Sequence, residues 1–287
     1  MVMDQVKLQA LRRLPKNFVS RVFGSICDVE FPAPMQRVVN SAFASYAGID
    51  ISEGERPPGE YCSLNAFFTR NLCEGARTIA SQDDHVLVSP VDGCLGAFGA
   101  ITGEVLLQAK GREYRLIDLV DSGEEAKRFL NGHYATIYLS PRDYHRIHSP
   151  SSGRIDKISY IPGYLFPVNP FAVDNIDELF AVNERLISYL ETPAAGRVAV
   201  IKVGATCVGR IGLSFDKFVT NTKFRRRREF EPVEAVAVDH GDELGVFNLG
   251  STVIVLISNP AFRFKDELEA GQVLRLGEII GNVDVGS

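Results

Sequence analysis

The feature that most constrains the fold is a short run of apolar and β-branched residues near the C-terminus, Val253 to Ile257. A run of this length and composition predicts a buried β-strand. Gly250, Ser251 and Thr252 stand directly before it. Glycine tolerates strained backbone angles, and the serine hydroxyl lies within local reach of the glycine carbonyl. The junction is therefore either an ordinary turn or a peptide placed for an intramolecular N-to-O acyl shift. From this stretch alone the turn, with Ser251 bonded to its own backbone, is the simpler interpretation.

Short apolar runs separated by turn residues recur from residue 86 onward, which predicts a β-rich domain of sandwich or barrel-like form. The runs are Val86–Val88, Gly93–Gly99, Val105–Leu107, Ala135–Leu139, Ile155–Ile161, Val198–Val203, Val233–Val238 and Val253–Ile257, with a last strand-turn-strand in 273–285. Helical spacing and early acidic residues predict helices over Leu116–Leu130 and Asp174–Leu190. The expected fold class is α+β.

Residues 4–48 carry apolar residues at helical spacing with basic residues between them, interrupted at Pro32–Pro34. This pattern is compatible with amphipathic helices on a membrane surface and with helices packed on the rest of the protein. Residues 51–60 are polar and rich in glycine and proline, as in a linker. We therefore expect an N-terminal helical segment over 1–50 and a second domain over 51–287.

Composition limits which partners and which cellular compartment we expect for this chain. The net charge of −5 over 287 residues gives no basic surface for nucleic acid, so we expect no nucleic-acid partner. Five cysteines without a Cys-x-x-Cys pair indicate a reducing compartment rather than a disulfide scaffold or structural zinc site. The sequence shows no signal peptide, and no apolar run approaches the ~18 residues of a spanning helix. The four-arginine run Arg225–Arg228 is either a solvated face or a contact for an anionic surface.

Two of the five histidines, His145 and His148, lie close together in the segment 140–150. A metal site would need further ligands at matching spacing, and none is evident, so we expect no metal. Imidazole titrates near neutral pH and suits acid-base work. Asp92 lies in an Asp-Gly turn after a predicted strand. A serine, a histidine and an aspartate can together activate a hydroxyl, but spacing alone does not show that they meet.

The junction Leu249–Thr252 resembles the self-cleavage motif of phosphatidylserine decarboxylase proenzymes of the prokaryotic, pyruvoyl-dependent type. Other blocks resemble that family in the same order, and the resemblance runs from about residue 10 to the end. These blocks are Tyr61–Leu72 with its Phe-Phe-x-Arg core, Ser89–Gly93, Tyr138–His148, Asn183–Arg185 and Val203–Thr206. The histidine block and the Leu-Gly-Ser-Thr junction are specific, whereas the Asp-Gly turn alone is weak. The Arg225–Arg228 run matches no block of the family.

The resemblance implies an inactive proenzyme that cleaves itself between Gly250 and Ser251. Asp92 would orient His148, and His148 would act as the base that activates Ser251. The products would be a β chain of residues 1–250 and an α chain of residues 251–287 that begins with a pyruvoyl group made from Ser251. This covalent cofactor would form a Schiff base with phosphatidylserine and release phosphatidylethanolamine. His145 would contact the headgroup or deliver a proton during turnover.

The resemblance also implies a heterodimer of β and α chains. Two such heterodimers could associate further, and the sequence leaves this open. It places the enzyme peripherally on the cytoplasmic face of the cell membrane, with the N-terminal helices on its anionic surface. Three alternatives remain. One is a serine hydrolase using Ser251, His148 and Asp92, although Ser251 lacks a Gly-x-Ser-x-Gly elbow. The others are a non-catalytic β module and a pyruvoyl decarboxylase acting on a soluble amino acid.

Overall fold

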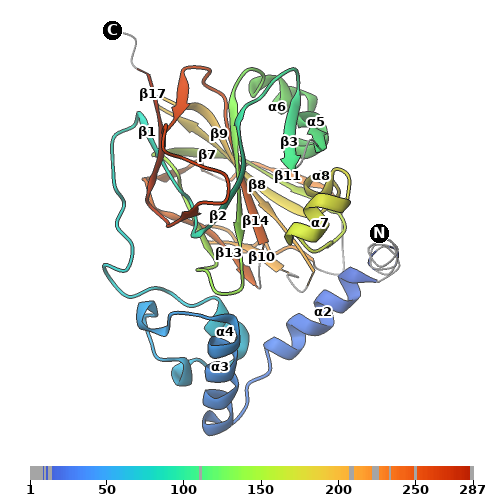
Figure 1. The fold of residues 1–287 in the computed structure, drawn as a ribbon, viewed down its shortest axis with the longest axis vertical. Helices are drawn as coiled ribbons and strands as arrows, with labels where there is room; N and C mark the ends of the chain where they lie inside the picture. The colour runs from blue at the N-terminus through green and yellow to red at the C-terminus, as the bar shows by residue number, and fades with distance from the viewer. Residues whose placement is uncertain are drawn as a thin grey trace.

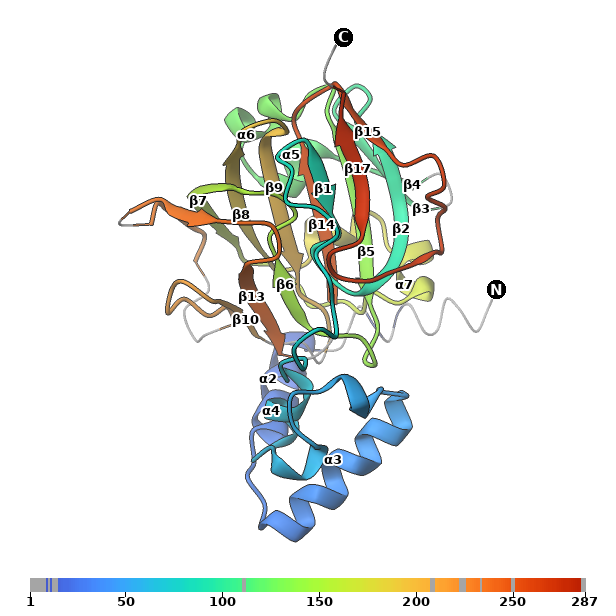
Figure 2. The same cartoon turned by 90° about the vertical axis from the view of Figure 1, so that its left-hand side faces the viewer.

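The computed structural model describes residues 9, 11, 15–109, 112–206, 210–221, 226–232, 234–248 and 251–284. The N-terminal part is helical, and in Figures 1 and 2 its blue helices lie below the body of strands. Its elements are α2 (Lys16–Cys27), α3 (Ala33–Ala47), the 3-10 turns η1 (Ile51–Glu53) and η2 (Pro58–Glu60), and α4 (Leu64–Phe68). The predicted helices and the break between them are present in the described part of 4–48.

Local sequence explains where these helices begin and end. Proline at the start of a helix lacks only an amide that would be unpaired there, so Pro34 is tolerated in the first turn of α3. Gly48 ends α3 with φ 72°, a left-handed conformation that glycine adopts at low cost. Ser63 caps α4 by accepting a hydrogen bond from the Ala66 amide at 3.1 Å.

A small core of Ala44, Ile49, Tyr61 and Phe67 packs α3 against the segment that leads into α4. It therefore links residues on both sides of the predicted boundary at residue 50.

The body contains most of the strands and four short helices. The helices are α5 (Leu116–Val120), α6 (Gly123–Arg128), α7 (Pro170–Asn175) and α8 (Leu179–Val182). The strands are β1 (Val86–Val88), β2 (Gly93–Ala100), β3 (Val105–Ala109), β4 (Arg112–Arg115), β5 (His133–Leu139), β6 (Arg146–His148), β7 (Gly153–Ile161), β8 (Arg185–Thr192), β9 (Gly196–Val203), β10 (Arg210–Leu213), β11 (Arg228–Phe230), β12 (Val236–Val238), β13 (Glu243–Asn248), β14 (Ser251–Ile257), β15 (Phe262–Phe264), β16 (Val273–Leu274) and β17 (Ile279–Val283).

The main sheet has nine strands in the order β11-β7-β8-β9-β14-β5-β2-β16, with β12 also paired to β7. Among the described residues the sheet is open, with β11 and β16 at its two edges, and it does not close into a barrel. The predicted α+β fold class is confirmed. Smaller sheets have the orders β1-β17-β15 and β10-β13-β6, and β3 pairs with β4.

The predicted strand at Val253–Ile257 is central to the main sheet. β14 pairs antiparallel with β5 on one side and β9 on the other, and all seven of its residues are buried. Burying each of its apolar side chains contributes about 1.5–3 kcal/mol. The preceding strand, β13, belongs to a different sheet. The chain therefore changes sheets between Asn248 and Ser251, and Leu249 and Gly250 lie outside the described residues.

The predicted helix over Asp174–Leu190 is wrong in its second half, where residues 185–192 form β8. Six consecutive residues of β8 are buried, so the strand lacks the alternation that would distinguish it from a helix. The helix predicted over Leu116–Leu130 is present in two pieces. Asp121 adopts φ 51° between α5 and α6, and Ser122 then caps α6.

Candidate functional site

Ser251 begins β14 with its side chain fully buried. It pairs with Leu139 of β5, and its Oγ has no hydrogen-bond partner among the described residues. Within the described part of the chain, Ser251 Oγ therefore makes no local backbone hydrogen bond of the kind found in an ordinary serine turn. A buried hydroxyl without a partner costs about 1–3 kcal/mol, which makes this one a candidate reactive group.

Ser251 lines a pocket of about 290 Å³ between the N-terminal helices and one end of the main sheet. The other lining residues are mostly apolar: Phe23, Phe43, Tyr46, Leu64, Phe68, Tyr138, Leu139, Pro141, Pro167, Val168, Asn169, Ala205 and Thr206. A buried polar atom at the wall of an apolar pocket is the arrangement of a ligand site that takes an apolar molecule with a polar end.

The order of strands brings Asp92 to the same end of the sheet. β5 lies between β14 and β2, Ser251 is opposite Leu139, and Cys94 is opposite Tyr138. Asp92, just before β2, is thus separated from Ser251 by the single strand β5. Its neighbour Gly93 must be glycine, because a Cβ there would lie 2.6 Å from the Tyr138 carbonyl oxygen.

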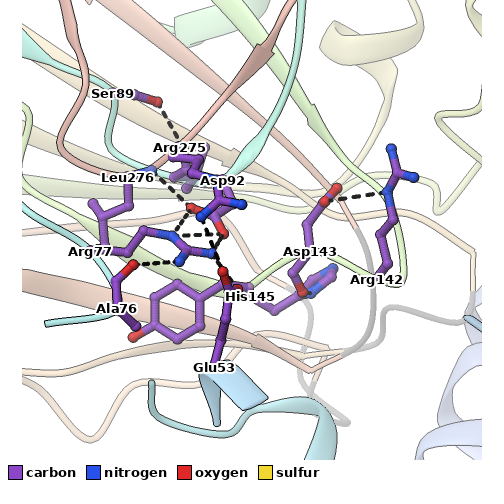
Figure 3. Close-up of polar contacts among 12 residues, drawn as sticks. Glu53, Ala76, Arg77, Ser89, Asp92, Arg142, Asp143, His145, Arg275 and Leu276 are labelled. Carbon is purple, nitrogen blue, oxygen red and sulfur yellow. Dashed lines mark hydrogen bonds and ion pairs between the residues drawn. The ribbon is translucent and has the colours of Figure 1, made fainter. Parts of the chain in front are cut away.

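Arginine, rather than histidine, binds the Asp92 carboxylate. Arg77 donates from Nε to Oδ1 at 2.9 Å and from Nη2 to Oδ2 at 2.5 Å, and the Leu276 amide donates to Oδ1 at 2.8 Å. Arg77 also donates to Glu53, as Figure 3 shows. The hydrogen bonds to Asp92 are the main cause that raises the pKa of Arg77.

His145 is completely buried at the end of the loop that follows β5. Its Nδ1 lies 2.8 Å from the Asp143 carbonyl oxygen. A carbonyl only accepts, so Nδ1 carries the proton and Nε2 holds a lone pair, for which the described residues provide no donor. The Phe68 ring packs on the imidazole with centroids 4.1 Å apart. Burial lowers the pKa of His145 to about 3, so the ring is neutral at pH 7.

His148 ends β6 and is held from both ring nitrogens. Nδ1 donates to the Gly241 carbonyl oxygen at 2.7 Å, and Nε2 accepts from the Tyr144 hydroxyl at 3.2 Å. Burial lowers the pKa of His148, while the Gly241 carbonyl and the Glu243 carboxylate act in the opposite direction.

The structure thus places Asp92 one strand away from Ser251, at the same end of the main sheet. His145 packs on Phe68, which lines the pocket of Ser251, and the His148 amide donates to the Pro90 carbonyl oxygen, two residues before Asp92. Among the described residues, no hydrogen bond joins Asp92 to either imidazole or either imidazole to Ser251 Oγ. His145 lies beside the part of β13 nearer to Ser251, because its carbonyl accepts from the Phe247 amide. His148 lies opposite Glu243, at the far end of β13. The assigned roles of these four residues stay predictions.

Three residues of this site were not singled out from the sequence. Tyr144 and Phe68 fall within the blocks Tyr138–His148 and Tyr61–Leu72, so the resemblance pointed to their segments but not to their roles. Arg77 carried no signal, because an arginine in a polar loop is usually a solvated charge.

Two other blocks that resemble the family, Asn183–Arg185 and Val203–Thr206, stabilise one wall of the pocket that Ser251 lines. Asn183 bonds the amide and carbonyl of Phe166 and the carbonyl of Gly204. The Thr206 hydroxyl donates to the Leu165 carbonyl. These bonds fix the segments that carry Pro167, Val168 and Ala205 into the pocket lining.

The arginine run is partly neutralised within the protein. Arg227 pairs with Asp121 and Glu229, and the Arg228 guanidinium lies over the Phe218 ring. Arg225 is outside the described residues. No cluster of three potential metal ligands occurs in the part of the chain that the structure describes.

Known proteins that are similar to this chain over nearly its whole length share one description. The family model described as phosphatidylserine decarboxylase matches residues 64–282. A phosphatidylserine decarboxylase proenzyme of Myxococcus xanthus is 43% identical over 282 residues, covering 97% of this chain and 98% of the relative. Proteins of the same description from Brevibacillus brevis (40% over 271 residues, 94% and 95% covered) and Shewanella loihica (39% over 289 residues, 98% and 100% covered) are also similar. The chain therefore belongs to the phosphatidylserine decarboxylase family.

Proposed function

We propose that this chain is a proenzyme that cleaves itself between Gly250 and Ser251 and then decarboxylates phosphatidylserine to phosphatidylethanolamine. The observation that carries the proposal is the buried, unpartnered Ser251 hydroxyl at the wall of an apolar pocket. The pocket suits the apolar part of a lipid, and its polar end is the serine that the resemblance marks for conversion. The proenzyme relatives support the same assignment.

In the cleavage reaction, Ser251 Oγ gives up its proton and attacks the Gly250 carbonyl carbon. The peptide C–N bond breaks and an ester forms. Loss of the Ser251 α proton then expels the Gly250 carboxylate, and addition of water with loss of ammonia leaves a pyruvoyl group at residue 251. A buried side chain of serine size at this position fits such a group. When present, it supplies a conjugated carbonyl that takes up electrons as CO2 departs.

We assign the base for cleavage to His148 and the substrate step to His145. A general base works best when its pKa lies near the operating pH, and the pKa of His145, at about 3, is far below it. Burial lowers the pKa of both imidazoles, and each has an arginine nearby that acts in the same direction, Arg70 for His145 and Arg146 for His148. Only His148 also has the Glu243 carboxylate beside it, which favours the imidazolium that proton abstraction creates. The free Nε2 of His145 instead suits a hydrogen bond from a substrate group.

The two product chains would stay together. The α chain would contribute β14, which lies between β5 and β9 of the β chain with all its residues buried. It would also contribute β16, paired to β2, and β17, paired to β1. Separating the chains would expose the centre of the main sheet, so the cleaved protein should be a stable heterodimer.

The N-terminal helices offer a surface for the membrane. Large apolar side chains that point to solvent are concentrated on α2 and α3: Phe18, Val22, Phe23, Ile26, Met35, Val38 and Tyr46. Phe23 and Tyr46 also line the pocket of Ser251, so the same helices connect this exposed surface to the candidate site. An exposed apolar surface of this kind supports peripheral docking on a lipid bilayer, which we place at the cytoplasmic face. None of the helices described combines the length and hydropathy required to span a membrane.

The decisive experiment is the intact mass of the purified protein under denaturing conditions. We expect two chains split between Gly250 and Ser251, the smaller with a blocked N-terminus. Their summed mass should differ from that of the full chain by the gain of one water and the loss of one ammonia. A single uncut wild-type chain would contradict the proposal and would suit a serine hydrolase.

Variants then separate the roles. Ser251→Ala and His148→Ala should remain uncut, whereas His145→Ala should be cut at least in part and should decarboxylate poorly. Normal processing of His148→Ala would show that the base is misassigned. Turnover of phosphatidylserine vesicles, compared with free serine, distinguishes a lipid substrate from a soluble amino acid.

A further inference from the structure

A second cavity, of about 220 Å³, is lined by Asp92 and by residues 142–144 of the loop that carries His145. Four arginines line it, Arg70, Arg77, Arg142 and Arg275, and we call it the arginine cavity. Four carboxylates line it as well, so the formal charges balance. The arginines therefore differ in whether their N–H donors are already bound to an acceptor.

The carboxylates are committed to other donors. Asp92 accepts from Arg77 and from the Leu276 amide. Glu53 bridges Arg77 and Arg275 through its two oxygens. Figure 3 shows Arg77 held between Asp92 and Glu53, which uses up this guanidinium.

Each of the remaining two carboxylates accepts two hydrogen bonds at one of its oxygens from a nearby serine. Asp50 accepts from the amide and hydroxyl of Ser52 at 2.9 and 2.6 Å. Asp143 Oδ2 accepts from the amide and hydroxyl of Ser140 at 2.6 and 2.7 Å. Its other oxygen lies 3.8 Å from Arg142. None of the four carboxylates forms an ion pair with Arg70.

Arg70 is a buried cation whose side chain has spare donors. It is 3% exposed, and its Nε and Nη1 have no hydrogen-bond partner among the residues that the structure describes. Within the same residues, its Nη2 donates only to the Arg142 carbonyl oxygen, at 3.5 Å. The Phe67 ring lies 5.6 Å from the guanidinium carbon. Burying a charge in this way is unfavourable unless an anion accompanies it.

We propose that the arginine cavity is an anion-binding site for a phosphate group, with the Arg70 guanidinium as its buried donor. Guanidinium matches phosphate oxygens with two parallel donors, and the partly exposed Arg142 and Arg275 can contact further oxygens from the rim. The phosphate can be free inorganic phosphate or the phosphodiester of a lipid headgroup. This site is separate from the pocket of Ser251, and the proposal goes beyond the decarboxylation proposed above.

The test is the thermal unfolding midpoint of the full-length protein in rising inorganic phosphate, against sodium chloride of equal ionic strength. Phosphate should raise the midpoint of the wild type beyond the chloride control, because a ligand that binds only the folded state stabilises it. Arg70→Met should lose this rise and, without phosphate, should unfold at the same or a higher temperature than the wild type. A purely structural arginine would instead give a lower midpoint. Arg112→Met, which removes a half-exposed arginine outside the cavity, should keep the phosphate effect.

Titration calorimetry with inorganic phosphate covers the case in which Arg70→Met fails to fold. Arg70→Lys keeps the charge but loses the two-pronged donor, so it should bind phosphate about tenfold more weakly. Glycerophosphoserine, the substrate headgroup without acyl chains, identifies the source of the phosphate. An Arg70-dependent effect of this compound at lower concentration than phosphate indicates a headgroup site, and an effect of phosphate alone indicates a free-phosphate site.

Absence of any phosphate-specific effect in the wild type would overturn the proposal, as would an effect that persists unchanged in both Arg70 variants. Because these measurements record binding rather than self-cleavage or turnover, their failure would leave the proposed function standing.

Discussion

Replacing Asp92 with asparagine should destabilise the folded chain before it affects any chemistry. The side chains of Asp92 and Arg77 are 9% and 8% exposed and form a two-pronged ion pair. Asparagine keeps the shape and removes the charge, so Arg77 loses its main partner and retains Glu53, which is 22% exposed. Breaking a buried ion pair from one side costs about 3–5 kcal/mol, and the surviving partner reduces that to about 2–3 kcal/mol.

The free energy of unfolding should be measured by urea titration in the Ser251→Ala background, in which the proposed cleavage would not occur. The chain has no tryptophan, so far-ultraviolet circular dichroism is the suitable signal. Asp156→Asn provides the matched control. Asp156 also binds an arginine, Arg197, but is 41% exposed, and its loss should cost less than about 1 kcal/mol.

The Arg77→Met variant separates structure from chemistry at Asp92. It removes the ion pair from the other side and leaves the carboxylate in place. If Asp92 only supports the fold, Asp92→Asn and Arg77→Met should lose similar stability in the Ser251→Ala background and, in chains that keep Ser251, should process to a similar extent. If Asp92 also orients a histidine, Asp92→Asn should process much worse at equal stability. An Asp92→Asn chain as stable as its parent would refute the reasoning about the buried pair.

Two further predictions concern the main sheet, and both are read by urea unfolding in the Ser251→Ala background. Lys202 is fully buried, and burial lowers its pKa to about 7. Between about pH 7 and 10.5 this lysine is therefore protonated in the unfolded chain and mostly neutral in the folded chain, so the free energy of unfolding rises with pH. Lys202→Met should therefore be more stable than its parent by on the order of 3 kcal/mol at pH 7, with the gain shrinking towards pH 10; no gain at pH 7 would contradict the assignment. Gly93→Ala should cost about 2 kcal/mol or more, because its Cβ would lie 2.6 Å from the Tyr138 carbonyl oxygen, whereas Gly96→Ala in the same strand, nearest 3.3 Å, should cost less. Equal losses in the two alanine variants would show that the backbone adjusts to the added methyl group.

Local patterns predicted most strands because turn residues separate their apolar runs. The same reasoning failed at residues 185–190, where β8 is buried over six consecutive residues. Such a strand offers no alternation, and its apolar residues also satisfy helical spacing. The order of strands in the main sheet was not predictable either, because it depends on long-range pairing such as that of β14 with β9.

At the candidate site, the resemblance located the segments more closely than it described their contacts. It selected Ser251 and both histidines, and the fold gathers these segments with Asp92 at one end of the sheet. It did not indicate that Arg77 occupies the Asp92 carboxylate, because the partner lies in a separate polar loop. A residue type at a given position does not specify which of several nearby groups it binds; that depends on the packing of the whole site.

The contacts of the two imidazoles bear on how often Ser251 reacts. A serine hydrolase regenerates its nucleophile in every cycle and therefore benefits from a resting hydrogen bond between base and serine. Here Nδ1 of each imidazole donates to a backbone carbonyl, and Nε2 of His148 accepts from the Tyr144 hydroxyl. Ser251 Oγ has no hydrogen-bond partner among the described residues. A reaction that each chain undergoes once needs only transient contact between base and serine, since the resulting product is permanent. The unpartnered hydroxyl raises the free energy of the uncut chain by about 1–3 kcal/mol. The absence of such a hydrogen bond among the described residues supports the proposal that Ser251 is consumed in a single event rather than regenerated in each turnover.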